Sequence, residues 1–403
     1  MIEAAADTGW RGYSLAERER RWGAVRQNAA REGLDCVLVP KGNRIDARYL
    51  TQMSNVGVIM PTDGRPPVVI ADGGSGNEWV PELRHLRDRD RPMWGPPTAQ
   101  VLEELGMTRG RIGVVGLGVG RVTHARAADG VVNYVAYADV LRRLPNATFV
   151  DATDVVGFVR YVKSEEEIAC LRRATAIAEA GIDEMIEVAR PGVDEAVLYG
   201  RVTGRLMELG SEHYGRARSD WTAHGWAFKA GPIDGSSPRF TDPPIGRRLQ
   251  PGHFITNEVS AIWGGMVAQE VQPIILGPVP ESWKPLVEIQ GRVWEDGLKL
   301  LKAGTPFMDL IEFVTSYSKD PRVRTTLTLH GRGAGDDGPL ITHRSSNEKI
   351  GDLKLEAETC WVWKPAAFSA DGKSEYQWGG DVVVRENGAE KLLNRPPGLV
   401  SIT

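Results

Sequence analysis

The stretch Thr328–Leu340, TLHGRGAGDDGPL, constrains this chain more than any other. The apolar run Thr325–Leu329 leads into it as a strand would, and His330 then stands among glycines. Asp336 and Asp337 follow a few residues later. Glycines let a backbone turn tightly and approach a ligand closely. The pattern therefore indicates a histidine held at a site, although a histidine between glycines is weak evidence by itself.

Three further stretches make this pattern informative. In chain order, the four stretches are His253–Gly277, Thr328–Leu340, Thr359–Pro365 and Tyr376–Glu390. In this order and at these distances they resemble the catalytic domain of the creatinase / Xaa-Pro aminopeptidase family, peptidase family M24. The pattern from His330 to Leu340 is most similar to the branch with creatinase-like and dimethylsulfoniopropionate-lyase-like members.

The resemblance covers nearly the whole chain and implies an α/β (α+β) fold. It predicts a smaller N-terminal creatinase-like α/β domain over residues 1–158 and a pita-bread catalytic domain over residues 159–403. A chain of 403 residues is long enough for two domains on general grounds. The same resemblance implies a homodimer, in which the N-terminal domain of one copy leans over the catalytic cleft of the other.

Bulk composition excludes several classes of protein. An apolar content of 41% and a charged content of 25% are ordinary for a soluble enzyme. A net charge of −4 gives no reason to expect a nucleic-acid or membrane partner. We see neither a signal peptide nor a run of about 20 apolar residues. The three widely spaced cysteines indicate buried reduced thiols, so we expect a cytoplasmic protein.

Helix and strand signals alternate along the first half. A capping box at Ser14–Glu17 predicts a helix to about Glu32, and Asp35–Val39 reads as a buried strand. Val56–Met60 and Val68–Ile70 are expected to form a hairpin. A further strand is expected at Ile112–Val115 and a further helix at Val132–Leu144.

The second half predicts a partial internal repeat. A capping box at Ser164–Glu167 starts a helix to about Ala189, and another helix runs from Asp194 to Gly210. A similar pattern follows the helix expected at Arg292–Lys302. Three pairs of positions align between the two copies: Gly192 with Gly304, Leu198 with Leu310, and Thr203 with Thr315. Such a duplication agrees with the pseudo-two-fold pita-bread fold.

The resemblance implies two divalent metals bound by two Asp, one His and two Glu, and here the chain departs from the family. The positions of the four acids fall on Asn257 or Glu258, Ala268 or Gln269, Lys364, and Gly379 or Gly380. Only His330 is clearly kept. An ammonium group repels the cations that would bind there. We therefore predict a site without metal, with a divalent metal as the alternative. Within the family, creatinase is the precedent for chemistry without metal.

A hydrolase without metal must move protons with side chains. The candidate catalytic groups are His330, Glu258, Glu270, Lys364, Asp336 and Asp381. A histidine titrates near neutrality and can act as base or acid, and Glu258 or Glu270 could orient it or hold a cationic substrate. Lys364 could stabilise an oxyanion, or its salt bridge could fill the former metal pocket. Asp336 and Asp337 could instead cap the loop.

Candidate substrate-binding residues are His224, Trp263, Trp363, Trp378, Arg216, Arg218 and Arg239. An arginine can clamp a substrate carboxylate. Tryptophans on the open face would suit a flat or cationic ligand. Trp361 and Trp363 share one face of a strand, and the alternative for all these tryptophans is core packing behind the sheet. For His213 we favour a surface or packing role.

Three hypotheses follow. The first is a metal-independent, creatinase-like hydrolase, or a lyase, which acts on a small molecule. The bond that we expect it to cleave is a C–N bond. The second is a metal-dependent Xaa-Pro aminopeptidase-like or dimethylsulfoniopropionate-lyase-like enzyme with unusual ligands drawn from Glu258, Glu270, His330 and Asp381. The third is a non-catalytic pita-bread binding protein. Metal analysis separates the first two, and a small-molecule melting screen tests the third.

Overall fold

The computed structural model describes residues 12–87, 93–123, 132–212, 226–232, 247–346, 350 and 352–403. The chain forms two compact units that divide after Tyr161, three residues beyond the expected boundary at residue 158. Among the described residues, the first unit contains residues 12–161 together with Ala334–Gly338. The second contains Val162–Gly333 and Pro339–Thr403.

The N-terminal unit is built on a six-stranded sheet in the order β4-β3-β2-β1-β5-β6. Its strands are β1 (Cys36–Val39), β2 (Gly57–Pro61), β3 (Val68–Ala71), β4 (Arg84–His85), β5 (Arg111–Val114) and β6 (Thr148–Asp151). The antiparallel pairing of β2 with β3 confirms the predicted hairpin. Strand β1 pairs with β2 antiparallel and with β5 parallel, as expected for mixed α/β structure.

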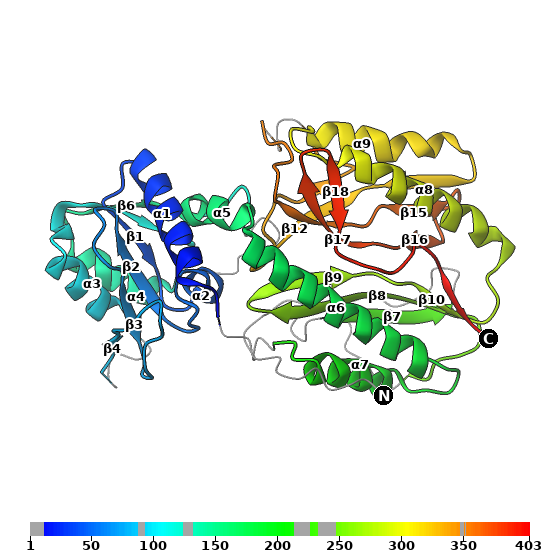
Figure 1. Cartoon of the computed structure of the whole chain (residues 1–403), viewed down its shortest axis with the longest axis horizontal. Helices are drawn as coiled ribbons and strands as arrows, with labels where there is room; N and C mark the ends of the chain where they lie inside the picture. The colour runs from blue at the N-terminus through cyan, green and yellow to red at the C-terminus, as the bar shows by residue number, and fades with distance from the viewer. Residues whose placement is uncertain are drawn as a thin grey trace. The chain divides into compact units, whose positions relative to one another are not determined.

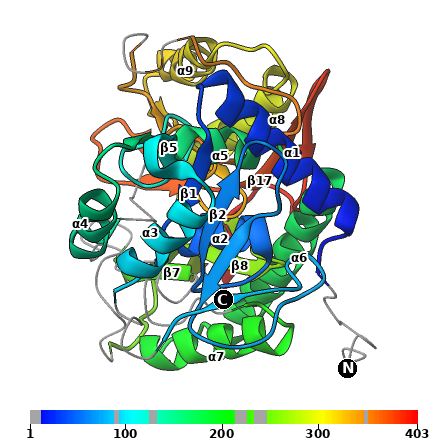
Figure 2. The same cartoon turned by 90° about the vertical axis from the view of Figure 1, so that its left-hand side faces the viewer.

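Helices cover this sheet on both faces. They are α1 (Leu15–Arg31), α2 (Arg44–Thr51), α3 (Gly95–Glu104), α4 (Tyr134–Arg143) and α5 (Thr153–Tyr161), with a short 3-10 helix at Met107–Arg109. Ser14 caps α1 by accepting a hydrogen bond from the backbone N–H of Glu17. Figure 2 shows α3 and α4 on one side of β1 and β2, and α1 on the other.

The second unit contains three sheets. The first, in the order β19-β10-β8-β7 with β9 paired to β8, comprises β7 (Trp226–Pro232), β8 (His253–Trp263), β9 (Met266–Glu270), β10 (Ile274–Leu276) and β19 (Val400–Ile402). The second, in the order β13-β12-β14-β17-β18, comprises β12 (Thr328–Arg332), β13 (Ile341–Thr342), β14 (Cys360–Trp363), β17 (Gly380–Arg385) and β18 (Gly388–Lys391). A third small sheet pairs β11 (Val323–Thr326), β15 (Ala366–Ser369) and β16 (Glu375–Gln377).

Two helix pairs back these sheets. They are α6 (Glu165–Val188) with α7 (Glu195–Glu208), and α8 (Lys284–Leu300) with α9 (Phe307–Ser316); short 3-10 helices lie at Glu281–Trp283 and Tyr317–Lys319. Figure 1 shows α6 running along β8 and β9. The predicted capping box is confirmed, because Ser164 and Glu167 each accept a hydrogen bond from the other's backbone N–H.

The predicted internal repeat is visible in the turns that precede α7 and α9. Gly192 and Gly304 have φ angles of 90° and 83°, a conformation that glycine adopts without steric cost. Leu198 and Leu310, at equivalent points of the two helices, are both fully buried. Each half is thus a helix pair followed by strands, as the sequence repeat predicted.

Strand alternation gives each large sheet of the second unit two distinct faces. In β8, Ile255, Val259 and Ala261 pack into one core with Ile177 and other side chains of α6 and α7. We call this side the helix face. The alternate residues Thr256, Glu258 and Ser260 point to the opposite side, which we call the inner face.

Candidate active site

A row of three residues crosses the inner face of the second sheet. His330 of β12 lies opposite Val362 of β14, and Val362 lies opposite Asp381 of β17. Directly opposed residues of antiparallel strands point to the same side of a sheet. Lys364, two residues beyond Val362, points to that side as well, and its contact with Glu258 of β8 confirms this direction.

The Glu258–Lys364 ion pair joins the two sheets. The Lys364 Nζ donates to Glu258 Oε1, and the two side chains are only 4% and 11% exposed. The pair also answers a question that the sequence left open, namely which of Asn257 and Glu258 faces the site. Glu258 lies on the inner face and Asn257 does not. Asn257 bonds the backbone of Gln272 in both directions, through its Nδ2 and its Oδ1. In this buried setting each charge depends on its partner, since an isolated buried charge is costly.

His330 is fully buried in β12. Its Nδ1 lies 3.4 Å from the carbonyl oxygen of Gly331. A carbonyl oxygen can only accept, so in the tautomer with the proton on Nδ1 this nitrogen can donate to Gly331 and Nε2 is the basic nitrogen. The expected glycine surroundings hold, but the imidazole has no direct access to solvent.

Asp381 is an inner-face carboxyl whose pKa lies near neutrality. Burial raises its pKa to about 7, although the charges of Arg332 and Lys364 and a hydrogen bond from the Gln269 backbone act in the opposite direction. That N–H donates to Asp381 Oδ2 at 3.1 Å. A carboxyl that titrates near neutrality can both accept and donate protons under ordinary conditions.

Glu270 lies on the helix face, which corrects its assignment to the catalytic set. It is opposite Val259, a member of the α6–α7 core, whereas its neighbour Gln269 is opposite Ser260 on the inner face. Burial and the nearby Asp381 and Glu179 carboxylates raise the pKa of Glu270 well above its ordinary value. The alternation of β9 therefore turns the Glu270 carboxyl away from His330.

The donor set does not fit a two-metal site. Gln269 stands on the inner face where the resemblance would place the second Asp, and the Lys364 ammonium stands at an acid position. A Cβ on Gly379 would lie 2.1 Å from the carbonyl oxygen of Trp363, so the backbone leaves no room for a side chain there. Over the described ranges, no cluster of three or more His, Cys, Asp or Glu side chains could hold a metal ion.

The tryptophans expected at the site belong to the core, which corrects a second set of assignments. Trp363 and the α8 residue Trp294 exchange hydrogen bonds, each indole N–H donating to the other's carbonyl oxygen at 3.0 Å. Trp378 is buried 4.8 Å from the Trp294 ring. Trp263 packs against the α6–α7 core beneath the guanidinium of Arg173. All three lie on the helix face, so they do not contact a ligand on the inner face.

Other predicted residues fall elsewhere. His213, His224, Arg216, Arg218 and Arg239 lie outside the described residues. Asp336 is half-buried in the segment Ala334–Gly338, which clusters with the N-terminal unit, and its catalytic role stays a prediction.

Asp337, in the same segment, has a clear structural role. It caps the turn by accepting from the Ala334 N–H at 2.8 Å, and it pairs with Arg160, which also pairs with Asp46. These contacts support the loop-capping interpretation of Asp337.

Two inner-face residues, Arg332 and Gln269, were not predicted as site residues from the sequence. Arg332 lies on the same side of β12 as His330, and its charge acts on Asp381. The alternation of β12 and β9 was the signal that could have identified both. The charges of Lys229, Lys364 and Arg324 all act on the Glu375 carboxyl, so Lys364 belongs to a wider group of charged side chains.

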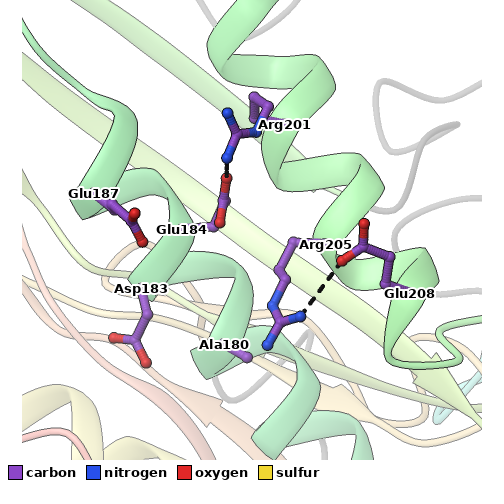
Figure 3. A pocket seen from close by; sticks show the side chains of 7 residues that line it. All are labelled: Ala180, Asp183, Glu184, Glu187, Arg201, Arg205 and Glu208. Atoms are coloured by element: carbon purple, nitrogen blue, oxygen red, sulfur yellow. Dashed lines mark hydrogen bonds and ion pairs between the residues drawn. The ribbon is translucent and has the colours of Figure 1, made fainter. Parts of the chain in front are cut away.

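A separate hollow of about 350 Å³ lies between α6 and α7, away from these residues (Figure 3). Two ion pairs lie within its lining, Arg201 with Glu184 at 2.6 Å and Arg205 with Glu208 at 3.4 Å. Asp183, also in the lining, pairs with Arg395. Nothing in this lining resembles the chemistry of the inner face.

Comparison with known proteins extends these observations. The sequence profile of the metallopeptidase family M24 matches residues 169–386. Creatinase from Bacillus sp. (strain B-0618) is 24% identical over 406 residues, which cover 96% of this chain and 92% of creatinase.

Solved structures show the same fold. A Xaa-Pro dipeptidase from Bacillus anthracis superposes with a TM-score of 0.74 at 17% identity, over 96% of this chain and 100% of the dipeptidase chain. An X-Pro aminopeptidase from Thermotoga maritima MSB8 gives 0.73 at 17% identity, over 94% and 99%. The predicted α/β fold with a pita-bread catalytic domain is thereby confirmed.

Proposed function

Because the chain belongs to the metallopeptidase family M24, we propose that it is a hydrolase that cleaves a C–N bond of a small molecule without a metal ion. The observation that carries this proposal is the buried Glu258–Lys364 ion pair. It holds an ammonium group where the family resemblance would place metal-binding carboxylates. The similarity to creatinase along nearly the whole chain supports a small-molecule substrate.

In this proposal the side chains of the inner face carry the chemistry. His330 Nε2 removes a proton from the attacking water and later returns it to the leaving nitrogen. The Lys364 ammonium stabilises the negative charge that develops on the substrate oxygen, and Glu258 holds Lys364 in place. Asp381, in the same cross-strand row as His330, is a second group that can exchange a proton near neutrality.

The first test is elemental analysis of the purified protein, with activity measured before and after chelation. We expect less than stoichiometric zinc, manganese, iron and cobalt, and full activity in excess chelator. Two metal ions per chain, with activity lost on chelation and restored by metal, would contradict the proposal. That result would favour the metal-dependent aminopeptidase-like or lyase-like alternative.

The non-catalytic alternative makes a different prediction. A scaffold protein would show no turnover and no shift in melting temperature with any member of a small-molecule library. Asp381 Oδ1 and Gln269 Nε2, which have no hydrogen-bond partner among the described residues, argue for a ligand on the inner face, because buried polar atoms are costly without a partner.

We further propose a cytoplasmic homodimer. Cys36, Cys170 and Cys360 are all buried and form no disulfide, which supports a reducing compartment. Among the described residues, no helix has the length and apolar composition needed to cross a membrane. The dimer rests on the family resemblance.

A further inference from the structure

Two buried polar atoms of the inner face have no hydrogen-bond partner among the described residues. They are Oδ1 of Asp381 and Nε2 of Gln269. The residues are 0% and 1% exposed. Buried acceptors and donors in native proteins are nearly always paired, so a persistent exception calls for an explanation.

One hydrogen bond ties the Asp381 side chain to the backbone of Gln269. The Gln269 backbone N–H donates to Asp381 Oδ2 at 3.1 Å, which leaves Oδ1 as the remaining acceptor of the carboxylate. Gln269 is opposite Ser260, and Asp381 lies in the row of His330, so both side chains are directed to the inner face. The pair therefore presents one acceptor and one donor beside the proposed catalytic groups.

A matching ligand must offer an N–H to Asp381 and an acceptor to Gln269. A carboxamide or ureido group carries both on one carbon atom. A guanidinium group carries donors only and would leave the Gln269 N–H unsatisfied. Arg332 and Lys364, whose charges both act on Asp381, also oppose a second cation there.

We propose that Asp381 and Gln269 form an amide subsite, which binds a neutral carboxamide or ureido group of the substrate. This inference rests on the proposed function and adds the substrate class. The subsite distinguishes a carbonyl-bearing substrate from its guanidinium isostere by hydrogen-bond polarity and not by shape.

The test compares two probes of equal shape, N-carbamoylglycine and guanidinoacetate, which differ in one C=O against one C=NH₂⁺. Their dissociation constants are measured by calorimetric titration of the full-length protein at about pH 8, where the Asp381 carboxylate is ionised. We expect the wild type to bind N-carbamoylglycine about ten-fold more tightly, the effect of one hydrogen bond made or lost.

Substitutions at Gln269 give the decisive result. Gln269→Glu replaces the donor with an acceptor and should reverse the preference toward guanidinoacetate. Gln269→Met should abolish the preference, and it serves as the test if Gln269→Glu does not fold. Gln250→Glu, at an exposed position, is the matched control and should leave both constants unchanged.

Tighter binding of guanidinoacetate by the wild type, or an unchanged preference in both folded Gln269 variants, would overturn the amide subsite. So would the absence of saturable binding of both probes at about 10 mM. These outcomes are separate from a failure of the proposed function, because they are measured without turnover. An active, metal-free enzyme that binds the two probes equally would refute the subsite alone.

Discussion

At the scale of single residues, the Glu258–Lys364 pair places a buried ammonium group on the inner face. Both side chains are largely removed from water, so neither charge is stable without the other. Removing one partner of such a pair typically costs about 3–5 kcal/mol, whereas the intact pair contributes little net stability. The pair is therefore better explained as a device that positions an ammonium group than as a source of stability.

His330→Gln and His330→Ala should each lower turnover by about 10²–10⁴-fold, because a general acid–base group is lost. The fold should survive, with a stability loss of about 1–3 kcal/mol for the alanine variant, since His330 is fully buried. Turnover and melting temperature are measured together. His85→Ala, at an exposed histidine of β4, is the control and should change neither. A His330 variant that melts early but turns over normally when folded would mark a core histidine.

Asp381→Asn should flatten the dependence of stability on pH. The folded-state pKa of Asp381 is about 7, above the ordinary 3.8. Between these values the folded state holds a proton that the unfolded state lacks, so stability falls as pH rises through this window. Glu270, whose raised pKa acts in the same direction, remains in the variant, and Arg332 and Lys364 still face the position.

Unfolding free energies from denaturant titrations at about pH 5 and pH 8 check this prediction. The difference between the two pH values should be smaller in Asp381→Asn than in the wild type. Asp309→Asn, at an exposed residue of α9, is the control and should retain the wild-type difference. An identical pH dependence in all three proteins would mean that Asp381 has an ordinary pKa.

At the scale of elements, the close packing of β14 against the start of β17 excludes a side chain at residue 379. A Cβ on Gly379 would lie 2.1 Å from the Trp363 carbonyl oxygen, and one on Gly380 would lie 2.0 Å from Glu270 Oε2. An acidic side chain at either glycine would therefore require movement of a strand or of Glu270.

Gly379→Ala should destabilise the protein by about 1–3 kcal/mol, because β14 must shift to admit the methyl group. The measurement is the midpoint of thermal or denaturant unfolding. Gly291→Ala is the matched control, because its Cβ would meet only the Pro397 side chain at 3.8 Å within helix α8. The control should be neutral or slightly stabilising, since alanine favours helix. Equal stability of both variants would show that the predicted clash is relieved without cost.

At the scale of the whole molecule, the homodimer is the prediction that bears most on function. Light scattering at micromolar concentration should give twice the 44.1 kDa chain mass. The expected reason is that a residue of the N-terminal domain of one copy completes the site of the other. A monomer that retains full activity at this concentration would contradict the prediction.

The sequence alone determined several of the elements, among them the helices that follow Ser14 and Ser164 and the β2–β3 hairpin. The cap at Ser164, the turn glycines at 192 and 304 and the apolar runs are local signals, and local signals suffice for such features. The family resemblance of four sequence stretches singled out His330 as a candidate and placed Lys364 at an acid position.

Only the tertiary structure decided which side chains share a face. In a strand, a shift of one residue exchanges the two faces. The strands at the site are buried on both sides, so their apolar pattern could not separate Glu258 from Asn257 or Gln269 from Glu270. Trp363 was ambiguous for the same reason. Pairing between strands and packing against α6 and α8 resolved these choices, and neither can be read from neighbours in the chain.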